Sequence, residues 1–132
     1  IFGSYPLVDL REKVGQTFNP SNHLWQDCIG FIDDVKRIKT DTQFLNLRGW
    51  VFHEDGKMTE DLFAFVGSDN QIKGYGLTGY ERPDVADIIN EKAYRSGFKG
   101  YIRASSQDKD LYIYHYSMNC RMRIKIPTPL LK

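Results

Sequence analysis

The chain has 132 residues, with 18 basic and 17 acidic side chains and a formal net charge of +1. This length predicts a single domain, and the near-neutral charge gives no electrostatic reason to expect nucleic acid as a partner. The sequence contains no run of about 18 apolar residues, so it predicts no membrane-spanning helix.

Residues 1–27 differ from the rest of the chain and are predicted to form a lead-in or linker segment. Residues 7–14 could make one or two helical turns, and the Asn-Pro-Ser-Asn sequence at 19–22 is a turn signal. We expect the segment either to lie over the following domain or to connect it to a neighbouring one. Because the chain begins with Ile1 rather than Met, we also expect it to be a piece of a longer protein.

Residues 28–132 repeat a pattern of short apolar strands separated by turn residues. Aromatic side chains make up 14% of the chain, with eight Tyr and eight Phe, which also favours strands. The strand at 71–77 contains Gly74 and Gly76, which indicate a bulge or the close approach of another backbone. The pattern predicts strands at residues 29–40, 43–53, 61–66, 71–77, 98–104, 111–118 and 120–126.

A short helical insert interrupts the strands near residues 84–94, where apolar side chains recur at helical spacing. Pro83 suits the first turn of such a helix, and Gly97 follows its end. Strands and helices do not alternate regularly along the chain, so a parallel α/β sheet is not expected. The sequence predicts a mainly β fold at residues 28–132, an antiparallel β-sandwich of immunoglobulin-like or jelly-roll-like type.

The two cysteines, Cys28 and Cys120, allow two interpretations. A disulfide between them would close a long loop and indicate an extracytoplasmic compartment. Two buried free thiols are the alternative, since Cys is often a small core residue. Their separation excludes a Cys-x-x-Cys redox pair and a zinc knuckle.

Aromatic side chains are the candidate ligand-binding residues. Trp50, on the strongest predicted strand, either stacks on a sugar from an exposed position or packs in the core, which is commoner in sandwiches. Tyr112, Tyr114 and Tyr116 alternate along another strand, so they form either a half-buried face or a flat binding platform. The full candidate surface also includes Tyr75, Tyr80 and Tyr101.

The cluster Glu81-Arg82-Pro83-Asp84 has a functional and a structural interpretation. Arg82 could grip an anionic ligand or sugar hydroxyls beside Asp84. In the structural alternative, Asp84 accepts amide hydrogens at the start of the helix and Arg82 pairs with a carboxylate or a carbonyl. We favour the structural role, because a short helix needs a fixed entry.

The sequence contains no recognisable pattern for catalysis or metal binding. His23, His53 and His115 lie on separate predicted elements, without Cys or carboxylate at ligand spacing. The turn carboxylates show no calcium-loop pattern, no spacing singles out a pair for glycoside hydrolysis, and no Ser or Cys lies beside a predicted base. We therefore expect no metal, no cofactor and no enzymatic activity in this domain.

Several short motifs occur in a defined order: Ile32-Asp33, Leu47-Arg48-Gly49-Trp50-Val51-Phe52, Arg82-Pro83-Asp84-Val85-Ala86 and Ser96-Gly97-Phe98. Together they resemble an accessory domain of bacterial cell-envelope proteins, in which a strand ending in Gly-Trp-Ala and an Arg-Pro-Asp-Val element precede a Gly-Phe strand. The resemblance extends over residues 30–126 and leaves out the lead-in segment. The chain departs from it at Val51, where the family usually has Ala.

Such domains resemble Ig-like or carbohydrate-binding-like sandwiches and are appended to glycosyltransferases and polytopic membrane proteins that build surface polysaccharide. The resemblance implies a non-catalytic domain in the periplasm or at the cell surface, tethered to the membrane, with Cys28 and Cys120 oxidised. Separately from the resemblance, Asp84, Gly97 and Phe98 are expected to have structural roles. The expected partners are the rest of a membrane-embedded protein and a cell-surface glycan or lipid-linked saccharide. The alternative is a carbohydrate-binding module that uses the exposed aromatic residues.

Overall fold

A computed structural model of the chain describes residues 14–19, 24–38, 44–54, 61–103, 105, 108 and 110–126. Two short helices follow the fifth strand, namely α2 (Pro83–Ile88) and the 3-10 helix η3 (Glu91–Arg95). The strands are β1 (Gln26–Asp27), β2 (Ile29–Arg37), β3 (Leu45–Phe52), β4 (Leu62–Gly67), β5 (Ile72–Tyr80), β6 (Gly97–Ile102), β7 (Asp110–His115) and β8 (Cys120–Lys125).

Some sequence-based predictions fall outside these described residues. They are the helical turns at 7–14, apart from the last residue, and most of the turn at 19–22. None of the described helices has the length and apolar character needed to cross a membrane.

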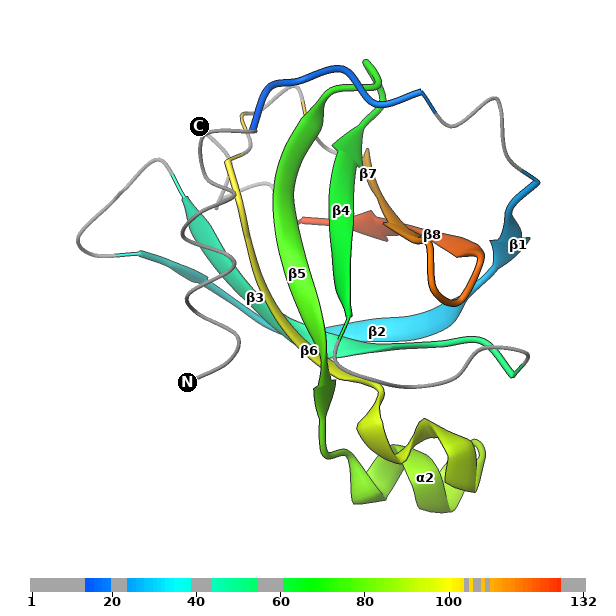
Figure 1. Ribbon diagram of the computed structural model, residues 1–132. Helices are drawn as coiled ribbons and strands as arrows, with labels where there is room; N and C mark the ends of the chain where they lie inside the picture. The colour runs from blue at the N-terminus through cyan, green and yellow to red at the C-terminus, as the bar shows by residue number, and fades with distance from the viewer. Residues whose placement is uncertain are drawn as a thin grey trace.

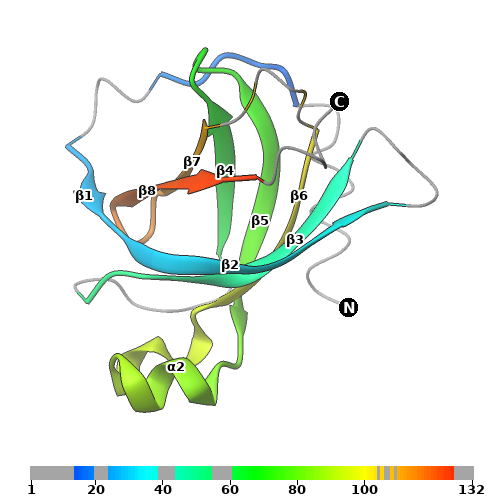
Figure 2. The ribbon, with the colours of Figure 1, turned by 180° about the vertical axis from the view of Figure 1, so that it is seen from behind.

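All eight strands form one sheet that curls on itself (Figure 1), and Figure 2 shows the same curl from behind. The strand order is β1-β8-β7-β4-β5-β6-β3-β2, and every pairing is antiparallel except that of β1 with β8. The predicted mainly β fold with a short helical insert is confirmed, although the insert consists of two helices. The finer prediction of a sandwich is not confirmed, because the strands belong to one continuous sheet.

The two ends of this sheet are joined by consecutive parts of the chain. β1 pairs with the start of β8, and after Cys28 the chain continues as β2, which pairs with β3. The segment 26–37 therefore passes from one end of the sheet to the other. This connection gives the sheet its curled shape.

The interior of the curl holds the main hydrophobic core. Gly76 makes room for a core ring, because a Cβ at this position would overlap the ring of Phe63. At Gly74 the backbone of Tyr101 comes equally close, as the glycine pattern of this strand predicted. The buried core side chains include Leu45, Leu47, Val51, Phe63, Phe65, Phe98, Ile102, Leu111, Ile113, Met118, Ile124 and Ile126.

A second, smaller apolar cluster lies on the outer face of the sheet, beneath the helical insert. It consists of Phe52, Val85 and Ala93, and the half-buried Trp50 packs against it. In Figure 1 the two helices project below the sheet, between the ends of β5 and β6. Trp50 therefore anchors the helical insert, and it does not belong to the main core.

Part of the lead-in segment pairs with the backbone at the start of β5. The N–H of Gly15 donates to the carbonyl of Ile72 at 2.6 Å, and that of Phe18 donates to the carbonyl of Asn70 at 2.7 Å. Farther along, Trp25 contacts aromatic rings of β7 and leads into β1. The described part of the segment thus takes the first of the two arrangements expected from the sequence.

Candidate functional site

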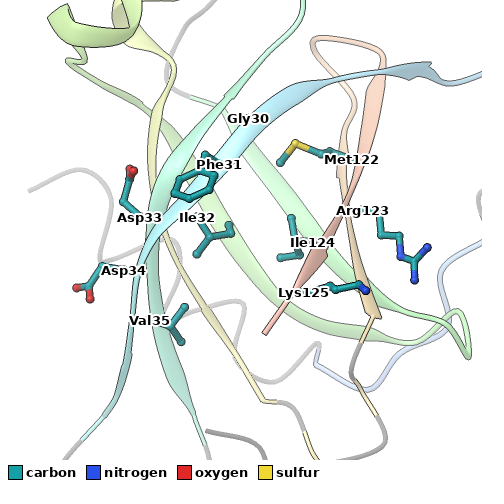
Figure 3. A pocket seen from close by; sticks show the side chains of 10 residues that line it. All are labelled: Gly30, Phe31, Ile32, Asp33, Asp34, Val35, Met122, Arg123, Ile124 and Lys125. Carbon is teal, nitrogen blue, oxygen red and sulfur yellow. The ribbon is translucent and has the colours of Figure 1, made fainter. Parts of the chain in front are cut away.

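An open space separates β2 from β8 where the curled sheet does not close, and we term it the β2–β8 gap. It has a volume of about 470 Å³, and Figure 3 shows its two walls. Among the described residues, β2 and β8 form no strand pairing with each other. The lining residues are Gly30, Phe31, Ile32, Asp33, Asp34 and Val35 from β2, and Met122, Arg123, Ile124 and Lys125 from β8.

A disulfide holds the narrow end of the gap. The Sγ atoms of Cys28 and Cys120 are 2.02 Å apart, and their Cα atoms are 5.1 Å apart. Both cysteines are buried, and the N–H of Cys28 donates to the carbonyl of Arg121 at 2.9 Å. The bridge therefore joins the segment between β1 and β2 to the start of β8, and it is the first of the two arrangements that the cysteines allowed.

A β-bulge interrupts β2 where the strand lines the gap. The register of β2 against β3 shifts between Ile32 and Asp34, so that Asp33 is the extra residue. A bulge bends its strand and increases its twist. β2 thus starts beside β8 at the disulfide and then diverges from it, which leaves a wedge-shaped space (Figure 3).

The floor of the gap is apolar. Ile32, Val35 and Met122 pack against the main core but are only partly buried. Met122 reaches across towards β2, because a Cβ on Gly30 would lie 3.0 Å from its Cε. These side chains point to the interior of the sheet at a place where no strand of the described residues covers them.

The rims of the gap carry charges of opposite sign. On the β2 side, Asp33 and Asp34 each already form an ion pair. On the β8 side, Arg123 pairs with Asp110 at 2.9 Å, whereas Lys125 is exposed and forms no ion pair among the described residues. The uncompensated charge at the gap is therefore positive and lies on β8.

Arg82 ties the start of α2 to β2. Its Nε and Nη2 donate to the carboxylate of Asp84 at 3.0 and 2.8 Å, and its Nη1 donates to Asp33 at 2.6 Å. The hydrogen bonds from Arg82 lower the pKa of Asp84 from 3.8 to about 2, and those to Asp84 and Asp33 raise the pKa of Arg82. The guanidinium is thus occupied by carboxylates of the protein, as the structural interpretation expected. The N-cap of α2 is Arg82 rather than Asp84, and it makes no side-chain capping hydrogen bond.

Gly97 and Phe98 begin β6 directly behind Arg82. A Cβ on Gly97 would lie 2.7 Å from the carbonyl oxygen of Tyr80 and 2.9 Å from Cγ of Arg82, so a larger residue would displace the arginine. Phe98 is buried in the main core, where its ring meets that of Phe63 edge-on at 5.2 Å between centroids. Both residues contribute to packing.

Trp50 does not lie with the tyrosines that were predicted to bind a ligand, although Tyr75 and Tyr101 are paired directly with each other. Trp50 lies beneath the helical insert on β3. The candidate tyrosines lie on other strands, and on the outer face Ala64 of β4 is paired with Tyr75 on one side and Tyr114 on the other. Those on and next to β7 are Tyr112, Tyr114 and Tyr116.

Two aromatic residues of the lead-in segment, which the sequence analysis did not single out, cover part of this tyrosine face. The ring centroids of Phe18 and Trp25 lie 4.9 and 5.0 Å from that of Tyr114. Tyr114 is consequently buried, while Tyr116 is 58% exposed. The sequence signal for this contact was the presence of aromatic side chains in an otherwise polar segment. Because the backbone there is irregular, these side chains follow no periodic pattern that would predict the contact.

His115 is buried at the end of β7, and this burial lowers its pKa from 6.5 to about 4. Its Nδ1 accepts the N–H of Met118 at 3.3 Å, so the ring proton lies on Nε2, which is 3.3 Å from Oγ1 of Thr78. The neutral ring therefore satisfies interior polar groups. In the part of the chain that the structure describes, no three His, Cys, Asp or Glu side chains gather as a metal site would need.

Comparison with known proteins identifies no relative of this chain: no protein-family model, no curated protein and no solved structure matches it. The function is therefore inferred from the chain's own residues and from their arrangement around the sheet.

Proposed function

We propose that this chain is a non-catalytic domain that positions a partner in an oxidising, extracytoplasmic compartment. The observation that carries the proposal is the Cys28–Cys120 disulfide at the narrow end of the β2–β8 gap. The bridge holds the two ends of the sheet together and leaves the space beyond it open. A site fixed in this way suits partner binding, because little ordering of the protein then opposes association.

The disulfide is also the basis for the proposed compartment. Disulfides persist in the periplasm, at cell surfaces and in secreted proteins, and they are rare where thiols are kept reduced. This bridge spans 92 residues, so it constrains most of the unfolded chain. A structural disulfide of this kind supports a periplasmic or cell-surface location.

The motifs around Trp50, Arg82 and Gly97 support a setting in the bacterial envelope. They resemble those of envelope accessory domains, and in this chain they lie together around α2. On this basis the domain is part of a larger, membrane-tethered protein that assembles surface polysaccharide or transfers glycosyl groups. Its partners are the rest of that protein and a cell-surface glycan or lipid-linked saccharide.

Trapping the thiols in host cells tests the proposed compartment. The cells are quenched in acid, and the denatured protein is treated with a maleimide before or after reduction. We expect Cys28 and Cys120 to be labelled only after reduction. Labelling of both without a reductant contradicts the proposal, and a Cys28→Ser variant, which frees Cys120, is the positive control for labelling.

Carbohydrate binding on the outer face is a second candidate, favoured by the aromatic side chains of neighbouring strands. Tyr75 is half-buried beside the small side chain of Ala64 and Tyr116 is exposed, whereas Tyr114 is covered by Phe18 and Trp25. Tyrosine offers an apolar ring with a polar tip, which suits a sugar. NMR titration with bacterial surface saccharides tests this candidate. Saturable shifts around Tyr75 and Tyr116 that a Tyr75→Ala variant abolishes support it, and a flat response excludes the saccharides tested.

A further inference from the structure

We propose that the β2–β8 gap binds an extended peptide as an added strand of the sheet, with apolar side chains facing the core and acidic side chains facing outward. The inference rests on the proposed function, because it names the kind of partner that the gap positions. Three features of the gap carry it: the backbone groups of its two walls, its apolar floor and the charge of β8.

The backbone of β8 presents hydrogen-bonding groups to the gap. The carbonyl of Arg121 accepts the N–H of Cys28 at 2.9 Å, so it points towards the end of β1. Along a strand, alternate residues direct their N–H and C=O groups to the same side. Those of Arg123 and Lys125 therefore point the same way, beyond the end of β1, where the described residues supply no strand to receive them.

β2 presents a matching edge from the opposite wall. The N–H of Ile38 donates to the carbonyl of Phe44 at 3.1 Å, on the side of β3. By the same alternation, Val35 directs its N–H and C=O groups away from β3 and towards the gap. An unpaired strand edge tends to pair with another strand unless it is shielded. Here the edges of β2 and β8 both face the β2–β8 gap. One extended segment would hydrogen-bond to both edges, as in β-strand addition.

The two faces of an added strand would meet different surroundings. Its inward side chains would cover Ile32, Val35 and Met122, which the sheet leaves partly exposed. Covering them removes apolar surface from water, so apolar residues are preferred at every second position. The gap volume of about 470 Å³ corresponds to about three strand residues, from the usual rise and the spacings between strands and between sheets.

The outward side chains of the added strand would lie next to basic residues. Arg121, Arg123 and Lys125 alternate along the exposed face of β8. Asp110 already pairs with Arg123, whereas Arg121 and Lys125 have no ion-pair partner among the described residues. The acidic residues of β2 are themselves paired, which weakens their repulsion of an incoming acid. Glutamate or aspartate therefore suits the outward positions.

A synthetic peptide tests this inference. The probe is a capped peptide of about six residues, the length of a typical strand, with Val and Glu at alternate positions. It is titrated into the isotope-labelled full chain and followed by NMR. We expect saturable shifts of the Val35, Arg123 and Lys125 amides and slower hydrogen exchange at the amides facing the gap. A control peptide with Lys in place of Glu should bind at least about tenfold more weakly.

Two substitutions at one position separate backbone pairing from charge. Lys125→Pro removes the N–H that faces the gap at an edge position where proline is tolerated, and we expect affinity to fall about tenfold or more. Lys125→Ala keeps the N–H and removes only an exposed charge, so a loss of about two- to fivefold is expected. A peptide that is N-methylated at alternate amides tests backbone pairing from the side of the peptide. The protein is unchanged in this experiment, so a loss of binding could not result from a folding defect.

Three results would overturn the inference. They are the absence of saturable shifts at the gap, equal binding of the acidic and basic peptides, and equal binding of the N-methylated and unmodified peptides. The proposed function fails by a different result, the labelling of free thiols in cells. If the protein is disulfide-bonded in cells but binds none of the peptides, the added-strand inference is wrong and the proposed compartment is still supported.

Discussion

The pKa values of Arg82 and His115 shift in opposite directions, because hydrogen bonds to carboxylates raise the first and burial lowers the second. Arg82 keeps its charge at the edge of the helical insert because Asp84 and Asp33 both accept its hydrogen bonds. His115 lies inside the sheet, where removal from water disfavours the charged ring more than nearby groups favour it. One residue therefore stabilises the fold as an ion, and the other does so as a neutral donor.

Arg82→Ala is expected to lower the free energy of unfolding by about 1 kcal/mol at neutral pH. Two carboxylates lose the arginine that they share, and the loss is modest because both are exposed and solvent partly screens their ion pairs. Asp84 has a folded pKa of about 2 against its usual 3.8, so its contribution is present above pH 3.8 and is lost as the pH falls towards 2. As the pH falls from 3.8 to 2, the free energy of unfolding should therefore decrease less in the variant than in the wild type. Urea unfolding at several pH values measures the difference. Wild-type stability in Arg82→Ala would contradict the structural role, and Lys36→Ala, which breaks a more exposed pair, is the matched control.

The burial of His115 predicts a second pH dependence of the free energy of unfolding, in a higher pH range. Its pKa is about 4 in the folded chain against 6.5 normally, so the unfolded chain takes up the proton first as the pH falls. The stabilisation is complete above pH 6.5 and declines as the pH falls towards 4, by about 3 kcal/mol in total. His115→Gln should remove this dependence while keeping a side-chain donor. Denaturant unfolding between pH 7 and 4 measures it, and equal slopes in the two proteins would show that another group is responsible.

At the residue scale, local contacts could be predicted from the sequence and distant ones could not. Asp84 lies two residues from Arg82, and a pairing of this kind was expected. Asp33, the other acceptor, lies 49 residues from Arg82 along the chain, so only the fold brings them together. The covering of Tyr114 by Trp25 was missed for the same reason.

At the scale of helices and strands, local sequence patterns could again be predicted, whereas long-range pairing could not. The predicted strand at 43–53 appears as β3 (Leu45–Phe52), because alternation of side chains is a local property. The predicted helix at 84–94 is broken, since the side chain of Asn90 accepts the N–H of Lys92 at 2.8 Å and starts η3 separately. Whether strands form one curled sheet or two stacked sheets depends on which edges pair, and no period along the chain encodes that choice.

The helical insert provides a prediction at this scale. Trp50 is half-buried beneath it, so we expect Trp50→Ala to lower the free energy of unfolding by about 2 kcal/mol. Phe65→Ala, in the main core, should lower it by about 3 to 5 kcal/mol. Hydrogen exchange should become faster in residues 83–95 of the Trp50 variant and stay unchanged in β4. Equal acceleration in β4 would mean that Trp50 supports the main core instead.

In the whole molecule, one covalent link and two strand residues join the ends of the sheet. The parallel pairing of β1 with β8 involves only Gln26 and Asp27, which is too short to leave a strand pattern in the sequence. The cysteine pair could be proposed from the sequence, but its position at the junction could not. The β2–β8 gap has no motif at all, because it arises from the divergence of two strands far apart in the chain.

Replacing Cys28 and Cys120 by Ala should therefore affect one region more than the rest. The closed loop spans 92 residues, so the chain-entropy model gives a loss of about 4 to 5 kcal/mol in the free energy of unfolding and a fall in Tm of about 10 to 20 °C. The strands from β7 to β3 keep their hydrogen bonds without the bridge, whereas only the short β1–β8 pairing then joins the two ends of the sheet to each other. Hydrogen exchange should accordingly quicken first at residues 26–37 and 120–126, and the gap should lose its fixed width together with its affinity for an added strand. An unchanged Tm, or exchange that quickens evenly over the sheet, would show that packing in the core rather than the disulfide holds the ends of the sheet together.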